Sequence, residues 1–196
     1  TLKGLTDKRS IRVETGSGDL LLTINSDNQV MVDMGVPRLE PASIPLLVDQ
    51  QKLQYAVDVG GHHIEFTALS MGNPHAVIQV DNIKTAAVEK IGAAMESHPV
   101  FPERANIGFS EITGKSSLSL RVFERGAGEK LACGSGACAA AVEGIKMGKL
   151  TSPVTVGLRG GERIIDWKGE GQQVLMTGPA TFVFGGRIEV WVRNKN

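Results

Sequence analysis

The sequence predicts an α+β protein with a mixed, mainly antiparallel sheet. About ten short segments alternate apolar and polar residues between turn-forming residues, as strands with one buried face do. Only two segments, 85–97 and 133–148, have the composition of helices. Because strands separate these helices without a regular strand–helix–strand repeat, the pattern favours α+β over a doubly wound parallel sheet.

The amino-terminal half consists of expected hairpins joined by one proline-rich link. Its strands, each bounded by turn residues, are expected at 10–15, 19–24, 29–35, 54–59, 63–70 and 75–80. The link, 36–45, breaks the alternating pattern with prolines and is a candidate crossover between domains. Gly60-Gly61 supplies the turn between two of the strands.

The carboxyl-terminal half contains both helices. Residues 85–97 carry apolar residues at helical spacing behind Thr85, which can cap the helix. Residues 98–109 are expected to be irregular, and the alanine-rich segment 133–148 is expected to form a helix that ends near Gly148. The remaining strands, recognised by their alternation, are expected at 117–126, 154–160, 163–169, 173–179 and 181–193.

Charge and composition exclude several classes of partner. The 196 residues carry 21 Lys and Arg against 21 Asp and Glu, so no charge excess points to a nucleic acid or to a membrane surface. The opening residues lack an apolar run, and we expect neither a signal peptide nor a transmembrane span. The 2 cysteines suit neither a disulfide framework nor a four-ligand zinc site, so a reducing cytoplasm is the expected location.

The segment 124–138 carries the most chemistry. Glu124 and Arg125 precede a glycine-containing loop, which leads to Cys133 at the start of the alanine-rich helix. The first turn of this helix, Gly134-Ser135-Gly136, offers unpaired N–H groups to an anion and lets a ligand approach the backbone. Because a helix N-terminus lowers the pKa of a thiol, Cys133 is expected to have a lowered pKa and to act in acid/base chemistry on a carboxylic acid.

The alternative interpretation of this segment is structural. Cys133 would then cap the helix, and the glycines would serve tight packing. Cys138 lies one turn inside the helix, where a cysteine behaves as a small buried apolar residue. Because residues five apart do not share a helix face, the two thiols are expected to have different roles.

Two polar loops offer further candidate site residues. Asn73 and His75 flank a turn signal between two strands and are expected at the rim of the sheet, where His75 would titrate near neutrality and adjust a nearby thiol. Arg104 and Asn106 bracket an irregular stretch, and Asn106 suits a polar ligand pocket. Turn formation is the alternative role in both loops. The histidines expected at a hairpin tip or a helix end, rather than at a metal, are His62, His63 and His98.

Three segments carry a resemblance to a known family. GNPHAVIQVD, FPERANIGF and RVFERGAGEKLACGSGACAAA, in this order, resemble diaminopimelate epimerase, and the similarity extends from LKGLTDKR to MTGPATFVFGG. The resemblance implies two similar domains, each a mixed sheet wrapped around a central helix, with the substrate between them. It also implies an amino-acid epimerase without a cofactor, which interconverts LL- and meso-diaminopimelate in lysine and peptidoglycan precursor synthesis.

The resemblance also implies roles for individual residues. In the family, a thiolate on one face of the substrate removes the α-proton and a thiol on the other face delivers one. Cys133 matches the second of these cysteines, while Gly134 and Ser135 match the helix start that holds the α-carboxylate. Arg125 matches the residue that binds the distal carboxylate. Groups that order the distal amino-acid end match Asn73, Asn106 and Glu124, and groups that adjust the thiol pKa values match His75 and Glu124.

One departure from the family pattern sets an expectation for this chain. The family's first cysteine lies in an upstream helix-opening motif that the 196 residues do not contain, and Cys138 cannot replace it because it shares a helix with Cys133. The chain is therefore expected to be a C-terminal portion that is inactive alone. Residues 1–34 would be a remnant of the first domain, 35–178 the complete second domain, and 179–196 strands that return to the first.

The expected partners are a small-molecule substrate and, in the full-length enzyme, a second copy of the chain. Phe184 stands where many family members carry a tyrosine linked to subunit pairing. Two alternatives stay open: a module that binds the carboxylates of an amino diacid without chemistry, and a racemase for proline or hydroxyproline. Arg125 and the paired asparagines favour the longer, doubly charged substrate.

Overall fold

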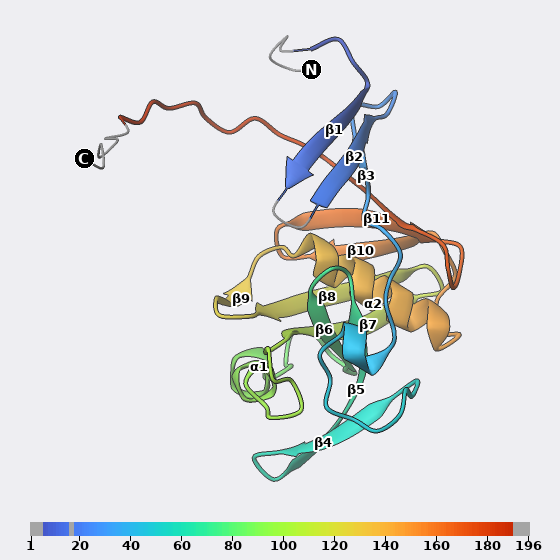
Figure 1. The fold of residues 1–196 in the computed structure, drawn as a ribbon, viewed down its shortest axis with the longest axis vertical. Coiled ribbons are helices and arrows are strands. Elements are labelled where there is room, and N and C mark those ends of the chain that lie inside the picture. Colours follow the sequence, from blue (N-terminus) through green and yellow to red (C-terminus); the bar gives the residue numbers. More distant parts are fainter. Residues whose placement is uncertain (1–5, 16–17, 190–196) are drawn as a thin grey trace, which may run out of the picture.

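In a computed structural model, which describes residues 6–15 and 18–189, one continuous sheet curls around a helix (Figure 1). The helical elements are α1 (Val88–Glu96), α2 (Gly134–Lys146) and the 3-10 turn η1 (Pro41–Ser43). The strands are β1 (Ser10–Thr15), β2 (Gly18–Ile24), β3 (Val30–Asp33), β4 (Tyr55–Val59), β5 (His62–Ser70), β6 (Pro74–Gln79), β7 (Asn106–Gly114), β8 (Ser117–Glu124), β9 (Gly128–Lys130), β10 (Val154–Leu158), β11 (Gly161–Trp167) and β12 (Val174–Gly178).

The strand order confirms the predicted α+β class. The sheet runs β1-β2-β3-β12-β11-β10-β8-β7-β6-β5-β4, and β9 pairs with β8 outside this path. In the described part of the chain, β6 pairs with β7 and β8 pairs with β10 in parallel, while the other pairings are antiparallel. The sheet is thus mixed and mainly antiparallel.

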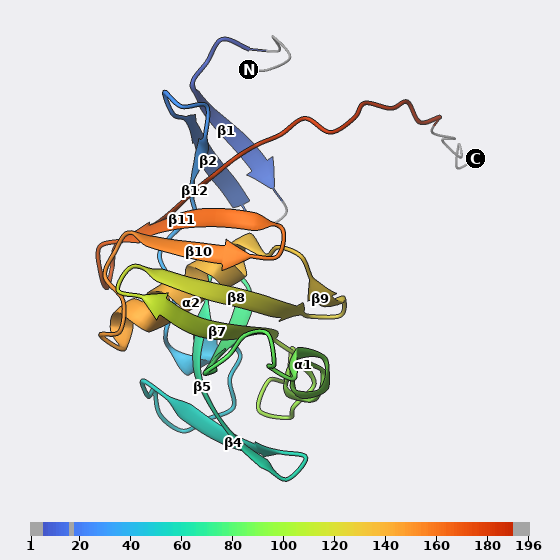
Figure 2. The same ribbon diagram turned by 180° about the vertical axis from the view of Figure 1, so that it is seen from behind.

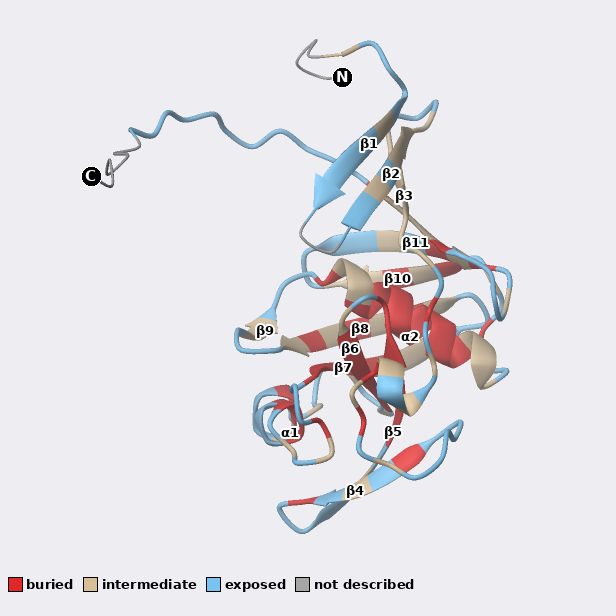
Figure 3. Ribbon diagram, viewed as in Figure 1, coloured by how far each residue is buried: buried red, intermediate tan, exposed pale blue. Residues whose placement is uncertain are grey.

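Helix α2 lies inside the curve of the sheet and is the centre of the larger core (Figure 2). All residues from Gly136 to Gly144 are buried (Figure 3). The helix contacts β5 to β8 and β10 to β12, so it is covered all round, as its apolar composition predicts. Small side chains let neighbouring residues approach the helix backbone closely. At Gly144, for example, a Cβ would lie 2.4 Å from Cδ1 of Leu150.

Helix α1 packs against the part of the sheet that contains β7 and β8, and it covers a second core formed with β4 to β7. Its approach to β8 is close, because a Cβ at Gly92 would lie only 2.7 Å from Cβ of Phe123. The helix starts later than predicted. Ala87 is the N-cap and makes no side-chain cap hydrogen bond, whereas the Thr85 hydroxyl donates to the Asn82 carbonyl oxygen at 3.4 Å.

Two predicted segments differ from the structure. Residues 98–109 are not irregular throughout, because Asn106 already starts β7, which pairs with β6 on one side and β8 on the other. This two-sided pairing outweighs the preceding turn-forming residues. Residues 181–189, expected as part of a strand, pair with no strand in the described part of the chain and run away from the sheet as an exposed segment (Figures 1 and 2). The rest of that expected strand, 190–193, lies outside the described residues.

The expected domain borders, after residues 34 and 178, lie at or next to the ends of two strands. Strand β3 ends at Asp33 and β12 ends at Gly178, and these two strands pair with each other. The division of the chain into 1–34, 35–178 and 179–196 stays a prediction. Within the described ranges, no helix is both long and apolar enough to cross a membrane.

Candidate active site

Cys133 lies at the N-cap of α2 and is buried, with 8% of its surface exposed. Cys133 therefore occupies the N-cap by position, as the capping alternative expects, although its side chain makes no capping hydrogen bond. The neighbouring glycines do serve tight packing. A Cβ at Gly134 would lie 3.2 Å from the Met176 sulfur, and one at Gly136 would lie 3.2 Å from Sγ of Cys133 itself. Glycine in the first turn therefore lets the thiol fold back over the helix start.

A chain of polar contacts connects this thiol to the rim of the sheet. Sγ of Cys133 lies 3.8 Å from Oγ of Ser135, which accepts a hydrogen bond of 3.3 Å from Nδ2 of Asn73. Oδ1 of Asn73 lies 3.1 Å from Nε2 of His75. Since an amide oxygen only accepts, His75 donates from Nε2. The structure thus brings together four of the residues expected in the site.

Both pKa expectations are wrong: the pKa of the Cys133 thiol is raised rather than lowered, and the pKa of His75 lies well below neutrality. Burial raises the pKa of Cys133 from 9.0 to about 11; Glu124 raises it further, while the Gly136 amide and the Ser135 hydroxyl lower it. Burial, helped by the positive charge of Arg125, lowers the pKa of His75 from 6.5 to about 3. At neutral pH the thiol is therefore protonated and the imidazole is uncharged. Removal from water outweighs the helix N-terminus in this site.

Cys138 is the buried apolar residue that the sequence predicts. It is 0% exposed, and burial raises its pKa. Both cysteines are free thiols. Among the described residues, no three His, Cys, Asp or Glu side chains form a group that could hold a metal ion.

The turn after β8 carries Arg125, whose backbone is fixed by Asn106. Oδ1 of Asn106 accepts a hydrogen bond of 3.0 Å from the Arg125 amide, and its Nδ2 donates to the Pro74 carbonyl oxygen at 3.0 Å. Asn106 is 5% exposed and uses both polar ends on backbone partners. The Arg125 guanidinium is exposed and donates to the Glu103 carbonyl oxygen at 3.1 Å.

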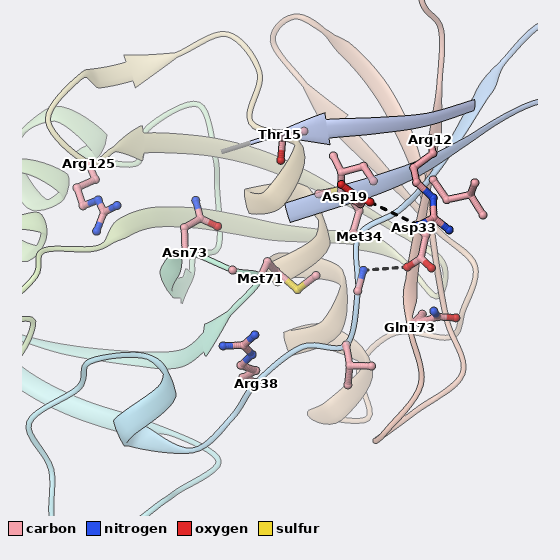
Figure 4. Close-up of a pocket in the computed structure, with 15 residues that line it drawn as sticks. Arg12, Thr15, Asp19, Asp33, Met34, Arg38, Met71, Asn73, Arg125 and Gln173 are labelled. Atoms are coloured by element: carbon pink, nitrogen blue, oxygen red, sulfur yellow. Dashed lines mark hydrogen bonds and ion pairs between the residues drawn. The ribbon is translucent and has the colours of Figure 1, made fainter. Parts of the chain in front are cut away.

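A cavity of about 890 Å³ opens in front of Asn73 and Arg125. In Figure 4, these two side chains stand on one side, and residues of β1 to β3, with Gln173, stand on the other. The lining residues not anticipated from the sequence include Arg12, Asp19, Asp33, Arg38, Met71 and Gln173. Met71 adjoins Asn73 in the same motif, so adjacency could have indicated it, whereas the others reach the cavity only through the tertiary fold.

Cys133, Gly134 and Ser135 do not line this cavity, although Ser135 is hydrogen-bonded to the cavity residue Asn73. His75 and Asn106 lie behind it as buried supports. Arg12 already forms an ion pair of 3.5 Å with Asp19. Arg125 and Arg38 make no ion pair with any carboxylate of the described residues, so they are the cationic groups available to an anionic ligand.

Solved structures identify the fold class. A probable proline racemase from Agrobacterium radiobacter is similar with a TM-score of 0.64 at 15% identity, over 96% of this chain and 63% of that chain. A phenazine biosynthesis protein of the PhzF family from Bacillus anthracis gives a TM-score of 0.61 at 17% identity, over 96% of this chain and 72% of that one. Fold and site together define a protein of the racemase and PhzF fold class, with a cysteine at the start of its central helix.

Sequence comparison then identifies the family. The diaminopimelate epimerase family model matches residues 67–183. A diaminopimelate epimerase from Ectopseudomonas mendocina is 53% identical over 188 residues, and one from Azotobacter vinelandii is 51% identical over 188 residues. Each alignment covers 96% of this chain and 68% of the relative. The chain belongs to the diaminopimelate epimerase family, and its enzyme class is that of the isomerases.

Proposed function

We propose that this chain carries one half of a diaminopimelate epimerase site: the anchors for both ends of the substrate and one of two catalytic thiols. The observation that carries the proposal is the contact chain from Cys133 through Ser135 and Asn73 to His75, beside a cavity that also receives Arg125. The steps described below use side chains and backbone groups and involve neither a metal nor an organic cofactor.

Binding of the substrate uses its two carboxylates. The N–H groups of Gly134 and Ser135 lack partners within the helix by virtue of their position, and they bind the α-carboxylate. The Arg125 guanidinium binds the distal carboxylate, and Asn73 and Glu124 orient the distal amino group. Because both ends of the substrate are fixed, only one of its stereocentres lies beside the thiol. This explains selectivity for one α-carbon.

Proton transfer then inverts that carbon. A thiolate on the opposite face takes the α-proton, the C–H electron pair stays on carbon, and the Cys133 S–H delivers a proton to the near face. The first thiolate becomes a thiol and Cys133 becomes a thiolate, so the total charge is unchanged. The raised pKa of Cys133, about 11, supports its role as the donor. His75, uncharged, acts by holding Asn73 rather than by stabilising a thiolate.

The second thiol is the element that this chain does not supply. Cys138 is the other cysteine in the 196 residues, and it is fully buried on the same helix as Cys133. The 196-residue chain alone therefore binds diaminopimelate but does not interconvert its LL and meso forms. The complete enzyme is a homodimer in the cytoplasm that serves lysine and peptidoglycan precursor synthesis.

Isotope exchange in D₂O at the substrate α-carbon tests this proposal. The chain should introduce deuterium slowly at alkaline pH without inverting the carbon, since Cys133 can remove and return a proton on one face only. Cys133→Ala should abolish the exchange, and Cys138→Ala is the matched control that should keep it. Full interconversion of LL- and meso-diaminopimelate by the 196-residue chain would overturn the single-thiol proposal.

A second candidate function is a carboxylate-binding module without chemistry, and it is favoured by Cys133 being buried and not lining the cavity. This candidate predicts binding of diaminopimelate in a calorimeter with no deuterium at the α-carbon at any pH. A panel that includes proline and hydroxyproline separates the diacid site from the other racemase alternative, because Arg125 would have no distal carboxylate to bind in either imino acid.

A further inference from the structure

Glu96, the last residue of α1, is a buried carboxylate that the mechanism above does not use. Only 7% of its side chain is exposed. Its Oε1 accepts a hydrogen bond of 2.8 Å from the amide of Gly126 and forms an ion pair of 3.3 Å with Nη1 of Arg104. Since a buried carboxylate is costly unless it is paired and hydrogen-bonded, these contacts hold Glu96 in one place.

The position of Glu96 follows from the close packing of α1. Gly92 and Glu96 are four residues apart and share a helix face. Gly92 lets that face approach Phe123, because any Cβ there would lie 2.7 Å from Cβ of Phe123. One helical turn later, Glu96 thus reaches Gly126, three residues beyond Phe123 on the other side of the contact.

Two consecutive amides of the turn after β8 are bound by buried side chains. Asn106 accepts from the Arg125 amide at 3.0 Å, and Glu96 accepts from the Gly126 amide at 2.8 Å. Gly126 has φ of 70°, a conformation that suits glycine. The two peptide groups that flank Arg125 therefore each donate to a fixed acceptor, one to Asn106 and the other to Glu96. A fixed backbone limits where the Arg125 guanidinium can lie at the cavity.

We propose that Glu96 is a positioning residue for recognition of the distal carboxylate: it holds the Gly126 amide and so directs Arg125 into the cavity. The proposal rests on the proposed function, in which Arg125 binds that carboxylate. Arg104, which has φ of 59°, forms the ion pair with Glu96. The loop that contains Arg104 and the turn that contains Arg125 are therefore joined through the Glu96 carboxylate. Glu96 itself touches no substrate.

The consequence is a selective effect on ligands with a distal carboxylate. Diaminopimelate and lysine share the α-amino acid end, and lysine lacks the second carboxylate. Loss of a hydrogen bond to a charged acceptor corresponds to a change of roughly tenfold or more in an equilibrium constant. Glu96→Ala should therefore weaken diaminopimelate binding by about tenfold, with less than about a twofold effect on lysine.

The experiment measures calorimetric affinity for diaminopimelate and for lysine in the 196-residue chain, together with hydrogen exchange of the Gly126 amide. Glu96→Ala should accelerate Gly126 exchange by about tenfold or more and leave the Arg125 amide protected. Glu96→Gln keeps an oxygen acceptor and should show smaller changes in the same direction; it also serves if the alanine variant fails to fold. Glu89→Gln, an exposed change on the same helix, should alter neither measurement.

The two measurements separate the inference from the function on which it rests. If the unmodified chain does not bind diaminopimelate, the proposed function fails, while Gly126 exchange still tests the contact of Glu96. If Gly126 exchange is unchanged in Glu96→Ala, or if lysine loses affinity as strongly as diaminopimelate does, Glu96 is not a positioning residue for Arg125.

Discussion

Glu143 makes the stability of this protein depend on pH. It lies on α2, is 3% exposed, and its Oε2 has no hydrogen-bond partner among the residues that the structure describes. Burial raises the pKa of Glu143 from 4.5 to about 7, and Lys149 lowers it in part. Because the unfolded chain releases this proton at lower pH than the folded chain, stability falls as pH rises from about 4.5 through about 7 and then levels off. The two pKa values differ by an amount that corresponds to about 3 kcal/mol.

Replacement of Glu143 by glutamine removes this dependence. We expect Glu143→Gln to gain up to about 3 kcal/mol relative to the unmodified chain between pH 4 and pH 8.5. The glutamine amide does not titrate, so its own effect on the free energy of unfolding is the same at both pH values. It therefore does not affect the expected gain between pH 4 and pH 8.5. Urea denaturation of both proteins at a series of pH values measures it.

Exposed Glu162 provides the matched control. Glu162→Gln makes the same chemical change in solvent and should give a nearly constant stability difference across the pH range. A constant difference for Glu143→Gln as well would refute the reasoning, because the buried carboxyl would then titrate as an ordinary one.

Three further predictions concern the site. Iodoacetamide should modify Cys133 slowly at pH 7 and faster as pH approaches about 11, while Cys138 in the folded chain should stay unmodified; mass spectrometry of peptides measures both. Asn106→Ala leaves the Arg125 amide and the Pro74 carbonyl group without their partner, so the free energy of unfolding should fall by about 1–3 kcal/mol in urea denaturation. Arg38→Gln removes a cationic group from the cavity, so diaminopimelate affinity should fall a few-fold at low salt and less at high salt; an effect independent of salt would contradict an electrostatic role.

Local sequence patterns predicted the parts of the molecule that local patterns determine. The alternation of strands, the Gly60-Gly61 turn, the alanine-rich helix and its end near Gly148 all depend on neighbours in the chain, and the structure confirms them. The start of β7 was not predictable in this way, because Asn106 becomes part of a strand through pairing on both sides. The exposed segment 181–189 has strand-like alternation but no strand beside it in the described part of the chain.

In the candidate site, too, some residues could be predicted from local sequence motifs and others could not. The motif that contains Cys133 and the motif that contains Asn73 and His75 could each be selected from the sequence, and the structure joins them by hydrogen bonds. Glu96 could not be selected, because its contact with Gly126 spans 30 residues and depends on the packing of α1. The prediction of a lowered pKa for Cys133 was wrong for a related reason. The burial that raises this pKa is produced by residues from several strands.

The competition between burial and the helix N-terminus also bears on the direction of proton transfer. A helix N-terminus stabilises an anion by about 0.3–1 kcal/mol, up to about 2 kcal/mol in partly buried sites. The rise in the Cys133 pKa from 9.0 to about 11 corresponds to roughly 3 kcal/mol in the opposite direction, so desolvation wins. In the proposed site, a carboxylate bound at Gly134 and Ser135 would add negative charge beside Sγ and disfavour the thiolate further. Under the proposed mechanism, substrate binding would therefore keep Cys133 protonated for donation, and the thiolate left after donation would be a strong base for the reverse reaction.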